Sequence, residues 1–173
     1  MIEQVQLRPV QVSDAEALAQ LYSSERTFLT PFDPVRPDGF YTVEGQRREL
    51  EESVAQRALD LRHRFLIMAE GRLAGALSIS NVVRGPFQSA HLGYFVAEHH
   101  NGRGVGTAAV AEATARAFGQ LRLHRLQAGT LVDNIGSQRV LEKNGFERIG
   151  LARGYLRIAG DWQDFFLFQR LSD

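Results

Sequence analysis

The stretch NGRGVGT, residues 101–107, decides how the rest of the chain is interpreted. It separates an apolar run of strand character, SAHLGYFVAE (89–98), from an alanine-rich run of helical character. Glycine tolerates positive φ and lets a ligand approach the backbone closely. A helix that begins here offers unpaired N–H groups and the positive end of its dipole. The stretch therefore predicts a phosphate or pyrophosphate site, with Arg103 as an additional charge contact.

Other interpretations of these glycines fit the sequence less well. A nucleotide P-loop ends in Gly-Lys-Ser/Thr, which the stretch lacks. Residues 104–109, GVGTAA, fit a loose dinucleotide motif, but they follow three apparent strands instead of opening a βαβ unit. The acidic residue expected at the end of the next strand is also missing. A turn that merely requires glycine remains the structural alternative.

The residues before 89 predict a strand, two helices and a hairpin. The first strand stops at Pro9. Ser13 or Asp14 can cap the first helix, which should fail before Pro31, where a loop with three prolines begins. The apolar face of the first helix is Ala15, Leu18, Ala19 and Tyr22, and that of the second is Leu50, Val54, Ala58 and Leu61. The runs 64–70 and 73–80 alternate like strands around a tight turn at 70–72.

The residues after 107 predict a helix, a strand, a short helix and a final hairpin. The alanine-rich helix has Ala108, Ala111, Ala115 and Phe118 on one face. HRLQAGTLV (124–132) is a strand, and Asn134 can cap a short helix that ends at 144–145. Residues 146–158 and 162–169 form the hairpin, with its turn at 159–161. Packing of its aromatic cluster, Trp162, Phe165, Phe166 and Phe168, is expected to be internal, with a homodimer contact as the alternative.

The element order β-α-α-β-β-β-α-β-α-β-β predicts an α/β fold of the α+β kind, a mixed sheet with helices on both faces. The 173 residues fit one domain, 1–173. A turn at 85–86 leads into the 89–98 strand and completes an antiparallel meander.

Composition excludes several function classes. Twenty basic side chains balance twenty acidic ones, which argues against nucleic-acid and membrane partners. No apolar run approaches the roughly 18 residues that span a bilayer. The chain has no cysteine, so disulfides, thiolate metal sites and a cysteine nucleophile are excluded, and we expect no metal. The N-terminal residues lack a signal-peptide pattern, and a cytoplasmic location is expected.

Gly104 and Gly106 also match the phosphate motif Q/R-x-x-G-x-G/A, although Asn101 replaces its first residue. The chain resembles the GCN5-related N-acetyltransferase (GNAT) superfamily through this motif, and its RimJ/RimL type, the ribosomal-protein-alanine N-acetyltransferases, through longer stretches. Those stretches are 26–36, 80–96, 101–107, 133–150 and 155–165. The resemblance covers nearly the whole chain and implies a mostly antiparallel sheet of about seven strands.

The resemblance implies acetyl-CoA as cosubstrate. The pantetheine arm would pair with the strand backbone at Tyr94, Phe95 and Val96, where the strands splay beyond Gly93. The pyrophosphate would meet the amides of Arg103, Gly104, Val105, Gly106 and Thr107. Asn134 and Ser137 match the family's N-x-x-S element, in which the asparagine holds the pantetheine and the serine reaches the CoA sulfur. Asn134 can equally be a simple N-cap, and Ser137 a solvent-facing hydroxyl.

The base and the acceptor site remain open at this level. An α-amine has a pKa of about 8, so a modest base or a water chain suffices, and the lack of cysteine favours direct attack. Asp164 and Glu98 are the candidate bases, although each can be a structural charge. His91 alternates with Gly93 along its strand and can face the cleft, but a lone strand histidine is often structural. By resemblance, Asp33, Asp38 or Asn81 would meet the cationic amine.

The leading hypothesis is therefore an enzyme that acetylates the N-terminal alanine or serine α-amine of a protein, ribosomal by resemblance. A small-molecule acetyltransferase of the same fold, acting on a polyamine, amino sugar or antibiotic, is the alternative. A polyamine site would require several carboxylates in the acceptor cleft. A non-enzymatic CoA-sensing domain would be favoured by loss of the glycines or of Asn134 and Ser137, and all of them are present.

Overall fold

A seven-stranded sheet forms the centre of the computed structural model, which describes residues 4–173. The strands are β1 (Val5–Pro9), β2 (His63–Ala69), β3 (Arg72–Val83), β4 (Ser89–Val96), β5 (Arg125–Leu131), β6 (Glu147–Ile158) and β7 (Asp161–Leu171). Their order across the sheet is β1-β2-β3-β4-β5-β7-β6. Of these neighbours, β4 and β5 run parallel and the other pairs antiparallel. The mixed, mostly antiparallel sheet is thus confirmed.

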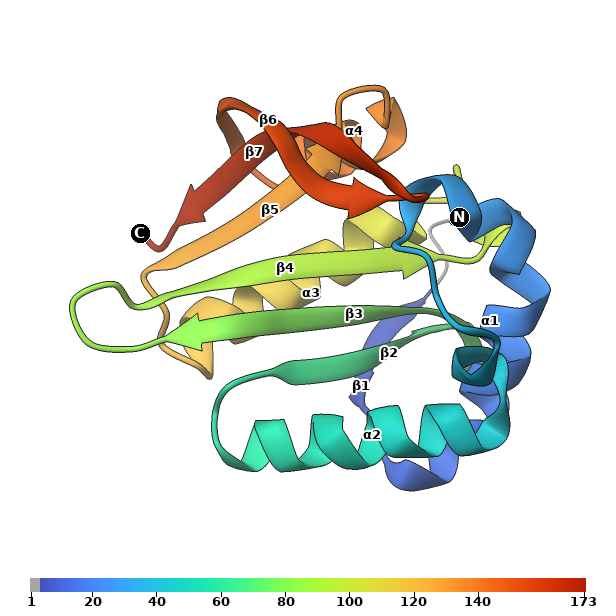
Figure 1. The fold of residues 1–173 in the computed structure, drawn as a ribbon. Helices are drawn as coiled ribbons and strands as arrows, with labels where there is room; N and C mark the ends of the chain where they lie inside the picture. The colour runs from blue at the N-terminus through green and yellow to red at the C-terminus, as the bar shows by residue number, and fades with distance from the viewer. Residues whose placement is uncertain (1–3) are drawn as a thin grey trace.

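Four α-helices cover the two faces of the sheet, as the sequence predicted. They are α1 (Ala15–Leu29), α2 (Val43–Ala58), α3 (Val105–Gly119) and α4 (Ile135–Lys143). Figure 1 shows α2 in front of the sheet and α3 behind it. The core behind the sheet joins α3 to β1–β5 and β7, whereas a smaller core joins α1 and α2 to β2. The front of β4, β5 and β7 is left without a helix over it (Figure 1).

Two hairpin turns follow from residues that adopt positive φ. Glu70 and Gly71 have φ of 49° and 75°, and Ala159 and Gly160 have 51° and 92°. Two successive positive φ values give a turn whose twist matches that of the flanking strands. The predicted turns at 70–72 and 159–161 are therefore confirmed. The predicted loop after α1 contains two 3₁₀ turns, Thr30–Phe32 and Asp38–Tyr41.

The predicted apolar faces of two helices were wrong in part. In α2, Gln46, Leu50 and Ser53 are buried, while Ala58 and Leu61 are exposed and the helix ends at Ala58. The Gln46 side-chain amide donates to the Phe40 carbonyl at 2.7 Å, and the Ser53 hydroxyl donates to a carbonyl one turn back. The buried Gln46 Oε1 has no hydrogen-bond partner within residues 4–173. Because these polar residues are buried, the face of α2 that packs against the protein differs from the face that the apolar residues predicted.

The alanine-rich α3 shows the same kind of error. Ala109, Ala113 and Ala117 face the core, whereas Ala111 and Ala115 are exposed. Alanines occur all around this helix, so their pattern gives no direction, and the contacts with the sheet and with α4 select the buried face. The 89–98 strand also ends earlier than predicted, at Val96, and residues 98–100 form a 3₁₀ turn.

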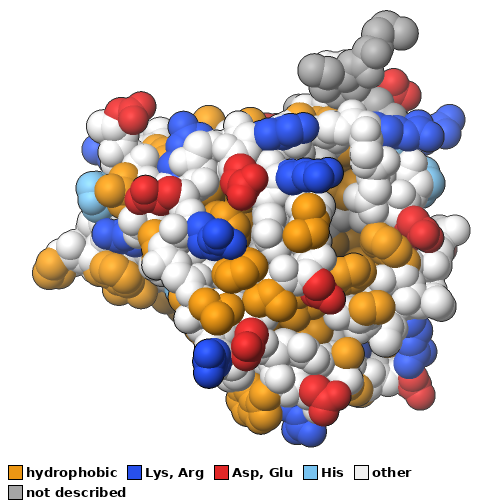
Figure 2. All heavy atoms as spheres, turned by 90° about the horizontal axis from the view of Figure 1, so that it is seen from above, with side chains coloured by type: hydrophobic (Ala, Val, Ile, Leu, Met, Phe, Trp, Pro, Cys, Tyr) orange, Lys and Arg blue, Asp and Glu red, His pale blue; other side chains and the backbone are white. Residues whose placement is uncertain are grey.

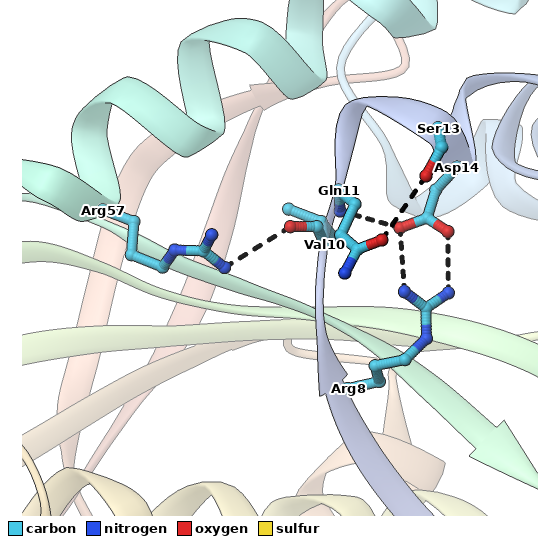
Figure 3. A network of polar contacts seen from close by, with 6 residues as sticks. All are labelled: Arg8, Val10, Gln11, Ser13, Asp14 and Arg57. Atoms are coloured by element: carbon cyan, nitrogen blue, oxygen red, sulfur yellow. Dashed lines mark hydrogen bonds and ion pairs between the residues drawn. The ribbon is translucent and has the colours of Figure 1, made fainter.

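An ionic network holds the connection from β1 to α1 (Figure 3). The Asp14 carboxylate accepts two bonds from the Arg8 guanidinium, at 2.7 and 3.2 Å, and one from the Gln11 N–H at 2.8 Å. Arg57 of α2 reaches the Val10 carbonyl at 3.4 Å. Asp14 is the N-cap residue of α1, one of the two predicted positions, but its carboxylate makes no capping hydrogen bond and takes part in this network instead.

The hairpin β6–β7 exposes part of its aromatic and aliphatic surface. Phe165 and Phe168 are buried as predicted, but Trp162 is 69% exposed. Ile149, Leu151 and Leu156 of the edge strand β6 are exposed as well. Figure 2 shows this upper face, on which hydrophobic side chains lie between scattered basic and acidic ones. A homodimer contact at this face stays a prediction.

Candidate active site

The parallel pair β4–β5 separates halfway along β4. The two strands pair from Ser89 to Leu92, after which β4 continues to Val96 on β3 and β5 continues to Leu131 on β7. Figure 1 shows them diverging toward their C-terminal ends. The splay beyond Gly93 is thus confirmed. Gly93 itself stays in register with Ser78, and the bulge lies further along β3, between Ser80 and Val83.

A cleft of about 430 Å³ runs from this splay to the start of α3. The predicted cofactor residues that line it are Tyr94, Phe95, Val96, Gly104, Val105, Gly106, Thr107, Asn134 and Ser137. Arg103 is exposed at the same turn. The structure therefore brings together two segments of the chain, β4 with the glycine-rich turn and the start of α4, that sequence reasoning could connect only by resemblance.

The glycine-rich turn presents a bare helix start to this cleft. Gly104 is the N-cap of α3 with φ of 85°, and Gly102 has φ of 76°. Within residues 4–173, a Cβ built at either glycine would meet no atom within 4 Å. The first amides of α3 lack carbonyl partners in the preceding turn, as in any helix. The start of α3 thus combines N–H groups that are not used within the helix, a positive dipole end and open space, which fit a pyrophosphate.

Gly106 has a different role from the two glycines before it. A Cβ at Gly106 would lie 3.6 Å from Val140 and 3.7 Å from Val96, at ordinary contact distances. A methyl group would therefore fit here without displacing either valine. Gly106 lines the cleft at a packed position between α3, β4 and α4, whereas Gly104 lies at its open mouth.

Two hydroxyl groups meet in the cleft. The Tyr94 Oη and the Ser137 Oγ are 2.9 Å apart, and either oxygen can donate. Burial raises the pKa of the Tyr94 phenol to about 12, against the opposing effect of the Ser137 bond. The phenol is therefore protonated at neutral pH. The pair carries more than one hydroxyl proton, so it can donate to a third atom in the cleft.

The start of α4 positions Ser137. The Asn134 Oδ1 accepts a bond from the Ser137 N–H at 3.1 Å, so the N-cap function of Asn134 is confirmed and its contact with pantetheine stays a prediction. Sequence reasoning missed the hydroxyl partner of Ser137, because Tyr94 was assigned a backbone role. It also missed Arg139 and Lys143, two basic residues one helical turn apart that line the cleft. Their i, i+4 spacing was the available signal.

The two candidate bases, Glu98 and Asp164, lie outside the described clefts. Glu98 is exposed after β4, and its N–H donates to the buried Glu25 carboxylate at 2.8 Å, which fixes this corner to α1. The Asp164 carboxylate accepts the Gly154 N–H at 2.8 Å, where β6 departs from its register with β7. Neither residue is among those that line the described clefts. A catalytic role for either stays a prediction.

A second groove of about 340 Å³ lies over β4, β5 and β7. Asn81, with φ of 51°, and His91 line it together with Gln127 and Tyr155. Gly93 lines this groove and Tyr94 the cofactor cleft, so the two cavities reach the splay from either side. As far as residues 4–173 show, the groove has no Asp, Glu, Lys or Arg in its walls.

Asp33 lies apart from this groove. Its carboxylate pairs with Arg36 at 3.1 Å, and its carbonyl accepts the Ala159 N–H at 3.0 Å. These contacts join the loop after α1 to the β6–β7 turn and border a smaller pocket of about 160 Å³. Asp38 pairs with Arg26 at 2.7 Å. The structure thus brings Asn81 and His91 together and places both aspartates elsewhere.

The described residues supply two further findings. Within 4–173, no group of three or more His, Cys, Asp or Glu is arranged to hold a metal ion. Over the same range, no helix combines the length and apolarity needed to cross a membrane.

A splayed strand pair, a bare helix start and a half-buried hydroxyl pair are together the features of an acyl-CoA-dependent transferase. Comparison with known proteins agrees. The family model for the acetyltransferase (GNAT) domain matches residues 4–147. The chain therefore belongs to the GNAT acetyltransferase family, and it is an N-acetyltransferase that uses acetyl-CoA.

Relatives cover nearly the whole chain. The probable N-acetyltransferase YjcK of Bacillus subtilis is 41% identical, over 92% of this chain and 90% of the relative. The [ribosomal protein uS5]-alanine N-acetyltransferase of Escherichia coli is 32% identical, over 93% of this chain and 84% of the relative. Mycobacterium smegmatis RimJ, solved in complex with CoA-disulfide, matches with a TM-score of 0.93 and 31% identity, over 97% of this chain and 82% of that one.

Proposed function

We propose that this N-acetyltransferase modifies the α-amine of an N-terminal alanine or serine, with a ribosomal protein as the acceptor. The observation that carries the proposal is the second groove, whose described walls hold neutral polar and apolar side chains and no carboxylate. A polyamine carries several positive charges, and a site for it would contain acidic groups. A peptide N-terminus presents one amine followed by an uncharged backbone, which suits such a groove.

The relatives add support to the ribosomal acceptor. The Escherichia coli relative is named for the alanine of ribosomal protein uS5, and its similarity covers 93% of this chain. The Bacillus subtilis relative, which is more similar, carries a name without an acceptor. The acceptor of the present chain is therefore proposed from the groove first and from the relatives second.

The residues of the cleft then have distinct tasks. Acetyl-CoA supplies an activated acetyl group and a thiol leaving group. The amides at the start of α3 would hold its pyrophosphate, and the edge of β4 from Tyr94 to Val96 would pair with its pantetheine arm. The Tyr94–Ser137 pair would donate to the sulfur as negative charge develops there. Attack is direct, because the chain has no cysteine to carry the acetyl group.

A panel of acceptors tests the proposal. Peptides with a free N-terminal alanine or serine should be acetylated by the purified protein and acetyl-CoA. The same peptides with a blocked N-terminus and one internal lysine should react far more slowly, because a lysine amine has a pKa near 10.4 against about 8 for an α-amine. Rates should rise between about pH 6.5 and 8.5 as the α-amine deprotonates.

Spermidine and an aminoglycoside complete the panel. Rapid turnover of either one, with inert free-N-terminus peptides, would replace the proposed acceptor by a small molecule. The assignment as an N-acetyltransferase would survive that outcome.

A further inference from the structure

The imidazole ring of His91 lines the second groove, beside the point where β4 and β5 separate. His91 of β4 lies opposite Ser80 of β3 and Gln127 of β5 in the strand register. It precedes Gly93 by two residues, so both lie on the same face of β4, and both line the groove. Tyr155 is the groove's other titratable residue.

The surroundings of His91 keep its ring neutral. Nδ1 is buried and has no hydrogen-bond partner within the described part of the chain, whereas Nε2 is not among these buried atoms and the residue lines the groove. Burial lowers the pKa of the imidazole from its usual 6.5. The polar groups that line the groove with it from other strands include the Ser80 hydroxyl, the Gln127 amide and the Tyr155 phenol, and none is a carboxylate.

An arginine that contacts β3 also disfavours a protonated His91 ring. The Arg62 guanidinium donates to the Ser78 hydroxyl at 3.3 Å, on the strand position that pairs with Gly93. A cation near the groove disfavours a second cation. The imidazole of His91 is therefore neutral before the acceptor binds, and it can accept a proton.

We propose, on the basis of the proposed function, that Nε2 of His91 accepts an N–H of the acceptor α-amine and takes that proton as the new C–N bond forms. The neutral amine contributes its lone pair to the acetyl carbon, and the C–S bond breaks. The amine nitrogen loses one proton to His91, which releases it to solvent through the open groove. The departing sulfur gains one proton from the hydroxyl pair, which solvent restores, so protons balance.

A weak base suffices for this step. The nitrogen becomes strongly acidic as it acquires positive charge, so a group that is unprotonated at neutral pH can remove the proton. The role requires contact with the amine, which distinguishes it from the hydrogen bonds found for the Glu98 N–H and the Asp164 carboxylate.

The variant His91→Gln tests the step, because glutamine retains a hydrogen-bond acceptor but cannot take the proton. With an N-terminal alanine peptide, kcat should fall at least about tenfold, while the peptide KM changes little. Acetyl-CoA affinity, measured by calorimetry, should be unchanged, which also reports on folding. His124→Gln is the matched control, since His124 is exposed in the loop before β5. Wild-type kcat in His91→Gln would overturn the assignment.

Two readouts separate proton transfer from a structural role. Below pH 6.5, the wild-type kcat should decrease in parallel with the His91 titration followed by NMR, and His91→Gln should lack this decrease. Addition of CoA and peptide should shift the His91 ring signals, and unchanged signals would overturn contact with the acceptor. If the wild type acetylates only polyamines, the proposed peptide acceptor is wrong, but the proposed role of His91 is not yet contradicted. The kcat of His91→Gln with the polyamine as acceptor then tests that role.

Discussion

The contact between Tyr94 and Ser137 sets the first prediction at the scale of single residues. Replacement of the serine by alanine, Ser137→Ala, should lower kcat by about tenfold or more while acetyl-CoA affinity barely changes. The reason is that a donor to the sulfur matters mainly once negative charge develops there. Stopped-flow measurement of the chemical step, with calorimetry for acetyl-CoA binding, checks it.

Tyr94→Phe is the matched partner of this variant, because it removes the other hydroxyl of the 2.9 Å contact. If the two hydroxyls act as one donor unit, the double variant should be no slower than the slower single variant. Wild-type turnover of Ser137→Ala under conditions where chemistry limits the rate would exclude the role.

At the scale of elements, the start of α3 is the feature that defines cofactor binding. Gly104→Ala adds a methyl group at the open mouth of the helix start and also strains a residue with φ of 85°. Acetyl-CoA affinity should fall at least tenfold, equivalent to about 1.4 kcal/mol. Isothermal calorimetry measures the loss directly.

The control variant Gly85→Ala distinguishes backbone strain at a positive-φ residue from steric obstruction of bound acetyl-CoA. Gly85 has φ of 68°, and its added Cβ would also meet no atom within 4 Å of the described chain, but it lies in the β3–β4 loop at the other end of the sheet. Both variants should lose similar stability, and Gly104→Ala alone should lose affinity. Equal affinities in the two variants would mean that the turn does not contact the pyrophosphate.

At the scale of the whole molecule, His91 couples folding stability to pH. Its pKa in the folded protein lies below the 6.5 of an unfolded chain, so the unfolded state binds more protons in the window between these two values. The free energy of unfolding should therefore decrease as pH falls through about 6.5. His91→Gln should flatten this part of the pH dependence, and His124→Gln should leave it intact. Denaturant unfolding between pH 7 and 5 checks the prediction, and identical slopes in wild type and His91→Gln would contradict it.

Sequence alone determined the features that depend on neighbouring residues. The element order followed from local period and from glycine and proline positions, and the turns at 70–72 and 159–161 follow from residues that adopt positive φ. The bare start of α3 likewise needs only the glycines of 101–107. The Asn134 cap also joins residues three apart in sequence. Such features form from contacts within a few residues, so their pattern is visible in a linear chain.

Only the tertiary structure decided which distant groups share a site. The buried face of α3 was set by its packing on the sheet, because alanine occurs on every side of the helix. Tyr94 and Ser137 meet although they are 43 residues apart, and Asn81 and His91 share a groove because a bulge and a strand register place them there. The Asp33 carboxylate pairs with the Arg36 side chain, and the Asp164 carboxylate accepts a hydrogen bond from the Gly154 N–H. Side-chain partners of this kind depend on how strands pair across the sheet, and the positions along the chain do not specify that pairing.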